Sequence, residues 1–250
     1  MKTVRLFIYL FLFTCAVSKS YAQTSVQKIE PVNFSQVEIE DSFWKPRIYT
    51  VSKVTIPVCI DQTDVKTGRI RNFEKVAAKK GEKHEGMYYD DSDVYKALEA
   101  IAYSLKNYPD PILEKKADEW IDKIAAAQLP DGYLNTYYTL VDIKLRWTNM
   151  DYHEDYCAGH LIEAAVAYFN TTGKRKLLDV AIRFANHIDS TFRLQNRHWV
   201  SGHQEIELAL VKLYKATGWI LLHCWGWYLH LWPSFFLWLQ AIRFSMLWEA

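Results

Sequence analysis

Two histidines stand at comparable points of the sequence, each just ahead of a segment with helical periodicity. His153 lies in "DYHEDYCAGH" and His203 lies in "GHQEIE". A neutral imidazole at such a place can hydrogen-bond a hydroxyl group or assist a proton transfer. If the starts of alternate helices meet at one rim, the two histidines could converge there. The same rim would gather five tyrosines: Tyr88, Tyr89, Tyr133, Tyr137 and Tyr138.

A second pattern in the same stretch is typical of metal ligands. His153, Cys157 and His160 are spaced four and three residues apart, so they share one helical face that could bind zinc. A structural zinc site normally needs a fourth ligand, and the sequence offers no obvious one. We therefore favour packing of Cys157 and His160 against a neighbouring helix, and we predict no metal site in this chain.

Two acidic clusters allow both a structural and a chemical interpretation. Asp90, Asp91 and Asp93 lie where a helix begins, and there carboxylates cap the backbone and suit the helix dipole. The chemical alternative is a set of acceptors for sugar hydroxyls. Glu205 and Glu207 follow His203 in a first helical turn, which is equally ordinary at a helix start. The sequence contains no Ser-His-Asp arrangement, phosphate loop or dinucleotide fingerprint.

The elements that must position these residues are predicted to be helices. One begins at Asp91 with apolar residues on one face, and the next begins at Pro111. Further helices are expected over about 154–170, 175–191 and 204–216, with Gly173 and Gly218 as natural stops. Residues 23–60 look mixed, with "VEIEDSFW" as a strand or an extended lead-in. The stretch 66–86 looks like a loop that contains a short helix.

An internal sequence repeat indicates how these helices are arranged. "GH" leads into "LIEAAVAYFNTTG" and again into "QEIELALVKLYKATG", and the closing glycines are 45 residues apart. A period of this length is typical of stacked helical hairpins, which form either an open solenoid or a closed α/α barrel. The long aromatic connection "LPDGYLNTYYT" favours the barrel, because solenoid repeats usually have short turns. We therefore predict an all-α fold.

Composition and the N-terminal segment limit where the protein acts. The formal net charge is +1 and no basic patch is present, so we expect no nucleic-acid partner. Residues 1–22 combine Lys2 and Arg5 with a short apolar run and small residues before a cut after Ala22. This predicts a signal peptide and an exported protein. Only three cysteines would remain after cleavage, which is not a disulfide framework.

The last 32 residues differ from everything before them. No charged residue occurs between Trp219 and Ile242, and six of the ten tryptophans lie in 219–250. The tryptophans are scattered, whereas a spanning helix carries them at its two ends. After Gly173 the chain continues as a charged amphipathic helix, and the internal repeat predicts a second such helix after Gly218. We therefore expect 219–250 to be a frameshifted or foreign tail, with a membrane anchor as the alternative.

Several long motifs resemble one enzyme family. "GMYYDDSDVYKALEAIAYSL", "IAAAQLPDGYLNTYY", "YHEDYCAGHLIEAAVAYFNTTGKRKLLDVA" and "GHQEIELALVKLYKATG" are similar, in this order, to the β-L-arabinofuranosidase family, glycoside hydrolase family 127. The resemblance covers about residues 38–218. It implies an α/α-barrel catalytic domain followed by β-rich domains, and retaining exo-hydrolysis of arabinofuranosides in plant glycans and glycoproteins. It places sugar-contacting histidines at His153 and His203.

The same resemblance implies groups that this chain lacks. In the family the nucleophile is a zinc-held cysteine, with further cysteine and glutamate ligands and a glutamate acid/base, all beyond the matched region. Cys157 and Cys224 occupy none of these positions. We therefore expect residues 23–218 to be the first portion of a truncated barrel, with no catalytic residue and no cofactor of its own, inactive alone. The alternative is an exported, non-catalytic helical-repeat scaffold, tethered to a membrane by its tail.

Overall fold

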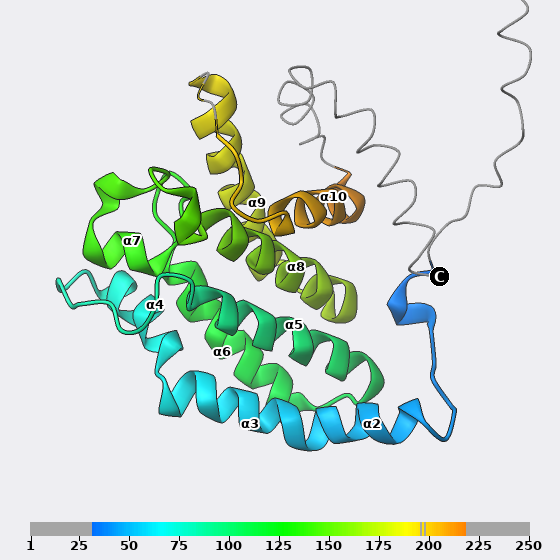
Figure 1. Ribbon diagram of the computed structural model, residues 1–250. Helices are drawn as coiled ribbons and strands as arrows, with labels where there is room; N and C mark the ends of the chain where they lie inside the picture. Colours follow the sequence, from blue (N-terminus) through cyan, green and yellow to red (C-terminus); the bar gives the residue numbers. More distant parts are fainter. Residues whose placement is uncertain (1–31, 196, 198, 219–250) are drawn as a thin grey trace, which may run out of the picture. The chain divides into compact units, whose positions relative to one another are not determined.

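The computed structural model describes residues 32–195, 197 and 199–218, and every regular element among them is helical (Figure 1). The prediction of an all-α fold is confirmed. A single 3-10 turn, η1 (Phe34–Gln36), belongs to a unit separate from the helical body that begins at residue 37. The predicted signal peptide (1–22) and the Trp-rich tail (219–250) lie outside the described residues. None of the described helices is long and apolar enough to cross a membrane.

The helices predicted from apolar stripes are present with nearly the expected bounds. They are α5 (Asp91–Asn107), α6 (Pro111–Ala127), α8 (Glu154–Thr172), α9 (Lys176–Asp189) and α10 (Glu205–Thr217). A π-helical turn, η6 (Ser190–Leu194), follows α9. Gly173 and Gly218 end their helices in the left-handed conformation, with φ of 74° and 68°, as the sequence predicted.

Residues 37–43, within the predicted extended lead-in, carry no regular element, and a long helical segment follows where the sequence looked mixed. It comprises α2 (Trp44–Thr50), η2 (Val51–Thr55), α3 (Ile56–Ile60) and η3 (Asp61–Lys66). Helix α4 (Arg69–Ala78) follows, which confirms the short helix expected within 66–86. The buried positions of the long segment include Ser52, Ile56 and Thr63, so its inner stripe is partly polar. Ser52 meets α5 through a hydrogen bond from the Ser104 hydroxyl of 2.8 Å.

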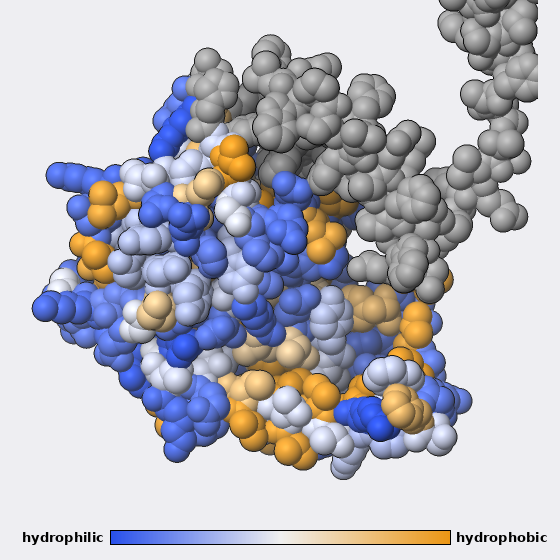
Figure 2. All heavy atoms as spheres, in the orientation of Figure 1, coloured by the Kyte–Doolittle hydropathy of each residue, from blue (hydrophilic) through white to orange (hydrophobic). Residues whose placement is uncertain are grey.

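This long segment also carries exposed apolar side chains on its other side. Val51, Val54 and Val58 are each about half exposed. Figure 2 shows apolar residues gathered over the segment that runs from α2 to α3, and the three valines belong to η2 and α3 within it. A spacing of three and four residues places them on one outer face of the helix.

The helices form two layers. Helix α8 packs against α5 on one side and α10 on the other, and α4, α6 and α9 pack behind them (Figure 1). Helix α8 is buried around most of its circumference, from Glu154 to Tyr168, because it lies between these neighbours. An inner row of helices backed by an outer row is the arrangement of part of an α/α barrel.

Helices α8 and α10 approach each other most closely at a glycine. A Cβ atom on Gly159 would lie 2.6 Å from Cγ of Glu205 and 2.9 Å from its backbone carbon. Only a residue without a side chain allows this approach. The close crossing brings the start of α10, and with it His203, against the first turns of α8.

The connection from α6 to α8 is long and aromatic, as predicted. It contains α7 (Thr136–Val141), η4 (Ile143–Leu145) and η5 (Met150–Tyr152). Gly132 fixes its beginning, because a Cβ there would lie 2.4 Å from the carbonyl oxygen of Arg183 on α9. The end of this connection delivers His153 to the start of α8.

Candidate functional site

The two predicted histidines come together on one tyrosine. The ring of Tyr156 lies 5.4 Å from the ring of His153 and 4.9 Å from that of His203, between ring centroids. His153 is the residue before α8, and His203 lies two residues before α10. The predicted convergence of two helix starts is therefore present in the structure. The role of these histidines as substrate ligands stays a prediction.

The tautomer of His203 follows from its hydrogen bond. Its Nδ1 atom accepts the backbone N–H of Glu205 at 3.1 Å. A neutral imidazole has one donor nitrogen and one acceptor nitrogen. The proton of neutral His203 therefore lies on Nε2, which makes that atom a hydrogen-bond donor for a ligand.

His153 is held in a backbone conformation that few residues adopt. Its φ is 61°, in the left-handed region, and its buried Nδ1 has no hydrogen-bond partner in the described part of the chain. Left-handed backbone at a non-glycine residue costs of order 1–3 kcal/mol and gathers at functional sites. A buried polar atom without a partner is equally unusual in a folded protein. Both observations point to a ligand at His153.

Aromatic rings extend the site away from the histidines. Tyr88 stacks on Tyr152 with ring centroids 4.6 Å apart, and Tyr88 and Tyr89 lie 5.9 Å and 6.1 Å from the ring of His153. Tyr137 lies 6.2 Å from Tyr88. Three of the five tyrosines predicted for the rim, Tyr88, Tyr89 and Tyr137, therefore take part in it.

The other two tyrosines correct the sequence analysis. Tyr133 and Tyr138 are buried, so neither lines an open rim. Tyr138 still touches the ring of Tyr137 at 5.4 Å from behind. Tyr133 belongs to the core, where its hydroxyl donates to Glu154 and its ring packs on Trp147. Tyr152, which the sequence did not single out, takes a place in the aromatic wall.

A row of polar side chains runs along α8, starting at His153. His153, Tyr156, His160 and Glu163 follow one another at helical spacing and face the same side. Burial, reinforced by the charge of Lys96 and by His203, lowers the pKa of His160 to about 4, so this imidazole is neutral near pH 7.

The row is completed by charged residues of α10. Nδ1 of His160 lies 3.4 Å from Oε1 of Glu205, and Lys212 donates to Glu163 at 2.5 Å. Burial raises the pKa of the Glu163 carboxyl and also that of Glu205. The neutral imidazole of His160, the phenol of Tyr156 and the Lys212–Glu163 pair suit an uncharged ligand rich in hydroxyl groups.

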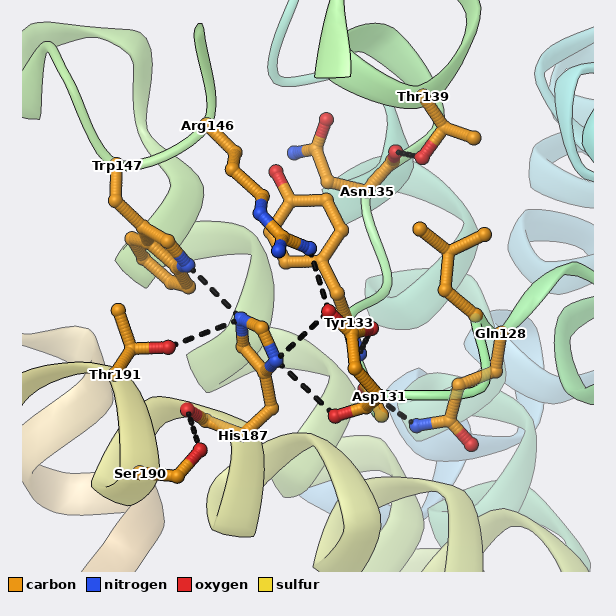
Figure 3. A network of polar contacts seen from close by, with 12 residues as sticks. Gln128, Asp131, Tyr133, Asn135, Thr139, Arg146, Trp147, His187, Ser190 and Thr191 are labelled. Atoms are coloured by element: carbon orange, nitrogen blue, oxygen red, sulfur yellow. Dashed lines mark hydrogen bonds and ion pairs between the residues drawn. The ribbon is translucent and has the colours of Figure 1, made fainter. Parts of the chain in front are cut away.

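A network of hydrogen bonds around His187 and Trp147 supports the start of α8 (Figure 3). The Nδ1–H of His187 donates to the carbonyl oxygen of Asp131 at 3.1 Å, and its Nε2 accepts the indole N–H of Trp147 at 3.1 Å. The backbone N–H of Trp147 then donates to Glu154 at 2.6 Å. Trp147 has a left-handed backbone with φ of 58°, so these bonds stabilise a strained residue. Because Glu154 is the neighbour of His153, the network fixes the backbone that presents His153.

The sequence analysis did not single out the two carboxyl groups at the start of α8, those of Glu154 and Asp155. Burial raises the pKa of Glu154 to about 7 and that of Asp155 to about 6. Asp155 accepts the indole N–H of Trp199 at 2.7 Å, which ties the segment before α10 to α8. Neither carboxyl is open to a ligand, because both are buried and hydrogen-bonded.

The acidic cluster before α5 has the structural role. Asp90 accepts the backbone N–H of Met87 at 2.8 Å, and Asp93 pairs with Arg69 at 2.6 Å. Asp91 is buried and accepts both the backbone N–H and the hydroxyl of Thr136, at 2.7 and 2.5 Å. Burial raises the pKa of Asp91 to about 6. These carboxylates join α5 to α4 and α7 and are not free acceptors for sugar hydroxyls.

The residues present do not fit a zinc ion. Among the described residues, no group of three or more His, Cys, Asp or Glu side chains is placed to hold a metal. Cys157 is buried and its thiol lies 3.6 Å from the carbonyl oxygen of Tyr89, while burial raises the pKa of that thiol well above its usual range. His160 packs on Tyr156 with ring centroids 4.5 Å apart. The packing interpretation of Cys157 and His160 is the one that the geometry supports.

A hollow of about 360 Å³ opens beside the buried network rather than at the two histidines. Its lining residues are Ile143, Lys144, Arg146, Trp147, Thr191, Gln195 and Arg197. Tyr156 and the three histidines around it, His153, His160 and His203, are half-buried.

Comparison with known proteins decides the family. A family model described as "Beta-L-arabinofuranosidase, GH127 catalytic domain" matches residues 36–219. This chain belongs to that family. The matched range includes every described helix from α2 to α10, which argues against an independent helical-repeat scaffold. The resemblance noted from the motifs is confirmed.

Relatives within GH127 share both sequence and fold with this chain. A β-L-arabinofuranosidase from Geobacillus stearothermophilus T6, with a known crystal structure, is 46% identical with a TM-score of 0.71; the match covers 78% of this chain and 31% of that one. A second solved GH127 β-arabinofuranosidase is 42% identical with a TM-score of 0.70, over 76% and 32% of the two chains.

A curated relative gives the same result. The non-reducing end β-L-arabinofuranosidase of Bifidobacterium longum subsp. longum is 38% identical over 207 residues, which are 73% of this chain and 32% of that protein. The chain therefore spans about a third of the length of these relatives.

Proposed function

We propose that the face around Tyr156 is part of the sugar-binding site of a β-L-arabinofuranosidase. The observation that carries the proposal is the convergence of His153 and His203 on one ring, in a chain of the GH127 family. Nε2 of His203 donates to a hydroxyl or ring oxygen of the sugar. The aromatic wall of Tyr88 and Tyr152 covers an apolar face of the furanose.

The chemistry of bond cleavage requires groups that this face does not offer. A retaining glycosidase needs a nucleophile and an acid/base residue on either side of the scissile bond. Glu154 and Asp155 are buried and hydrogen-bonded, and the buried Cys157 thiol faces the carbonyl oxygen of Tyr89, just before α5. Glu163 pairs with Lys212, and Glu205 lies beside His160. We propose that the nucleophile, the acid/base residue and the zinc ligands belong to the two thirds of the relatives' length that this chain does not match. By itself the 250-residue chain then binds sugar without cleaving it.

We further propose that the protein is exported and that the mature chain begins at Gln23. The positive start, the short apolar run and the small residues before the cut support this. N-terminal sequencing of protein made in a bacterial host with a secretion system tests it. Retention of residues 1–22 in the exported fraction would contradict cleavage after Ala22.

Binding of methyl β-L-arabinofuranoside to the full chain tests the proposed function. We expect saturation-transfer NMR signals from the sugar, and a loss of affinity of about tenfold in His153→Ala and in His203→Ala, since a hydrogen bond contributes about 0.5–1.5 kcal/mol. Lys176→Ala serves as the control, because Lys176 is exposed on α9. Binding that is absent in the wild type, or unchanged in both histidine variants, would overturn the assignment.

A further inference from the structure

A lysine from the neighbouring helix reaches the centre of the histidine cluster. Nζ of Lys96, on α5, donates to the hydroxyl of Tyr156 on α8 at 2.5 Å and lies 4.7 Å above the ring centroid. It also donates to the hydroxyl of Ser92 at 3.3 Å. In the described part of the chain no carboxylate lies within ion-pair distance of this ammonium. A half-buried ammonium without a carboxylate partner is costly, so a role beyond packing is indicated.

Two hydrogen-bond donors of the Lys96–Tyr156 pair have no acceptor among the described residues. An ammonium group has three N–H donors, and Lys96 uses two of them on Ser92 and Tyr156. The Tyr156 oxygen accepts from Lys96, so its own O–H can donate elsewhere, and no described residue accepts it. The O–H of Tyr156 and the Nε2–H of His203 are therefore two donors available to a ligand that supplies acceptor oxygens.

Tyr156 is also the ring on which the imidazoles are arranged. Its centroid lies 5.4 Å from that of His153, 4.5 Å from His160 and 4.9 Å from His203. A phenol ring on a helix can rotate about its side-chain bonds unless its far end is held. Lys96 holds that end from the opposite helix, so the distance between the two sugar-binding histidines depends on this bond.

We infer that Tyr156 is a sugar-contacting residue, which donates its hydroxyl to an oxygen of the furanoside, and that Lys96 is the positioning residue that orients it. The inference rests on the proposed function of this face. It assigns the bottom of the site to α5 as well as to α8 and α10.

Three variants of the full chain test the pair with methyl β-L-arabinofuranoside as the probe. Tyr156→Phe removes the hydroxyl and keeps the ring, Lys96→Met keeps the length and removes the donors, and Lys96→Arg restores a cation. We expect about tenfold weaker binding in Tyr156→Phe and in Lys96→Met, and partial recovery in Lys96→Arg. The double variant should bind no more weakly than Tyr156→Phe alone, because the two residues act through one contact.

A ligand-free measurement separates positioning from general damage to the fold. In the NMR titration of the ring protons of His160, Lys96→Met should raise the pKa, because the ammonium lowers it in the wild type. Lys115→Met is the matched control, since Lys115 is exposed on α6, and it should leave both binding and titration unchanged. Thermal melts of all variants establish that each is folded.

The outcomes distinguish this inference from the proposed function. A wild type that binds the sugar, with Tyr156→Phe and Lys96→Met equally tight, would overturn the inference and leave the proposed function standing. A wild type that binds no sugar would overturn the proposed function and with it the contact role of Tyr156. An unchanged His160 titration in Lys96→Met would overturn the positioning role of Lys96, whatever the binding result.

Discussion

His187 is neutral because both of its ring nitrogens are already committed. Nδ1 must carry the proton, since it faces the carbonyl oxygen of Asp131, and Nε2 must be free of one, since it accepts the indole N–H of Trp147. A second proton on Nε2 would make that nitrogen a donor, and it would then face the indole N–H of Trp147, which is also a donor. Burial lowers the pKa of His187, although Asp131 opposes the shift.

Acid should therefore weaken the fold through this residue. The folded-state pKa of His187 lies below the unfolded value of about 6.5, so the unfolded chain binds the proton more readily and stability falls as pH drops below that value. We expect the melting-temperature advantage of the wild type over His187→Gln to shrink between pH 7.5 and pH 5.5. Taking the difference between the two proteins removes the contributions of other titrating groups. An advantage that is constant with pH would show that His187 is not held neutral.

Glu154 should give the opposite dependence. Its folded-state pKa is raised to about 7 by burial, against an ordinary value of 4.5. The folded chain keeps the proton longer than the unfolded chain, so the stabilisation is complete below pH 4.5 and is lost as pH rises through about 7. Glu154→Gln mimics the protonated carboxyl at every pH. In thermal melts, we expect the stability of the variant relative to the wild type to increase from pH 5 to pH 8. A decrease over this range would contradict the raised pKa.

The sequence predicted the meeting of His153 and His203 but not the residues behind them. The histidines were found because each precedes a helix with clear apolar periodicity, and helix starts on one side of stacked hairpins meet at one rim. Glu154 looks like any acidic residue in a first turn. Its two donors, Tyr133 and the backbone of Trp147, come from 21 and 7 residues away. Such a network depends on tertiary contacts that have no local pattern.

At the scale of elements, a helix could be predicted from the sequence where its buried face is apolar, and was missed where that face is partly polar. Helix α5 was predicted because Val94, Leu98, Ile101 and Leu105 repeat at helical spacing, and all four are buried. The segment 44–66 was missed because its buried positions include Ser52 and Thr63. Its β-branched residues and Pro57 also favour extended chain. The π-helical turns η2 and η3 surround Pro57 and accommodate it within an otherwise helical run.

The crossing of α8 and α10 makes a prediction about one glycine. Gly159→Ala adds a Cβ that would lie 2.9 Å from the backbone of Glu205, so α10 must move. Overpacking of this kind costs about 1–3 kcal/mol. We expect a lower melting temperature and altered NMR shifts of the His203 ring, because His203 moves with α10 relative to Tyr156.

The control for this experiment is the glycine at the other end of the same helix. At Gly173 a Cβ would meet no atom within 4 Å, and asparagine tolerates its left-handed backbone. Gly173→Asn should therefore leave both the melting temperature and the His203 shifts near those of the wild type. Equal effects of the two substitutions would show that the α8–α10 crossing does not depend on Gly159.

At the scale of the whole molecule, the described helices form one sector of an α/α barrel. Helices α5, α8 and α10 present a polar inner face, and α4, α6 and α9 back them. The inner face supplies donors, neutral imidazoles and aromatic rings, which are the means of holding a sugar. Its carboxyl groups lie against neighbours, Glu163 on Lys212 and Glu205 beside His160, and the Cys157 thiol is buried. Under the proposed function, binding and cleavage belong to different parts of the GH127 domain.

This division predicts that the purified 250-residue chain does not hydrolyse an aryl β-L-arabinofuranoside. Loss of one member of a catalytic unit costs several orders of magnitude in rate, and under the proposed function both the nucleophile and the acid/base lie outside the described residues. The measurement is release of the phenol at a sugar concentration that saturates binding, with and without added zinc salt. A relative with the full GH127 domain serves as the positive control. Turnover by this chain that disappears in His153→Ala would place a catalytic group on the face around Tyr156 and refute the division.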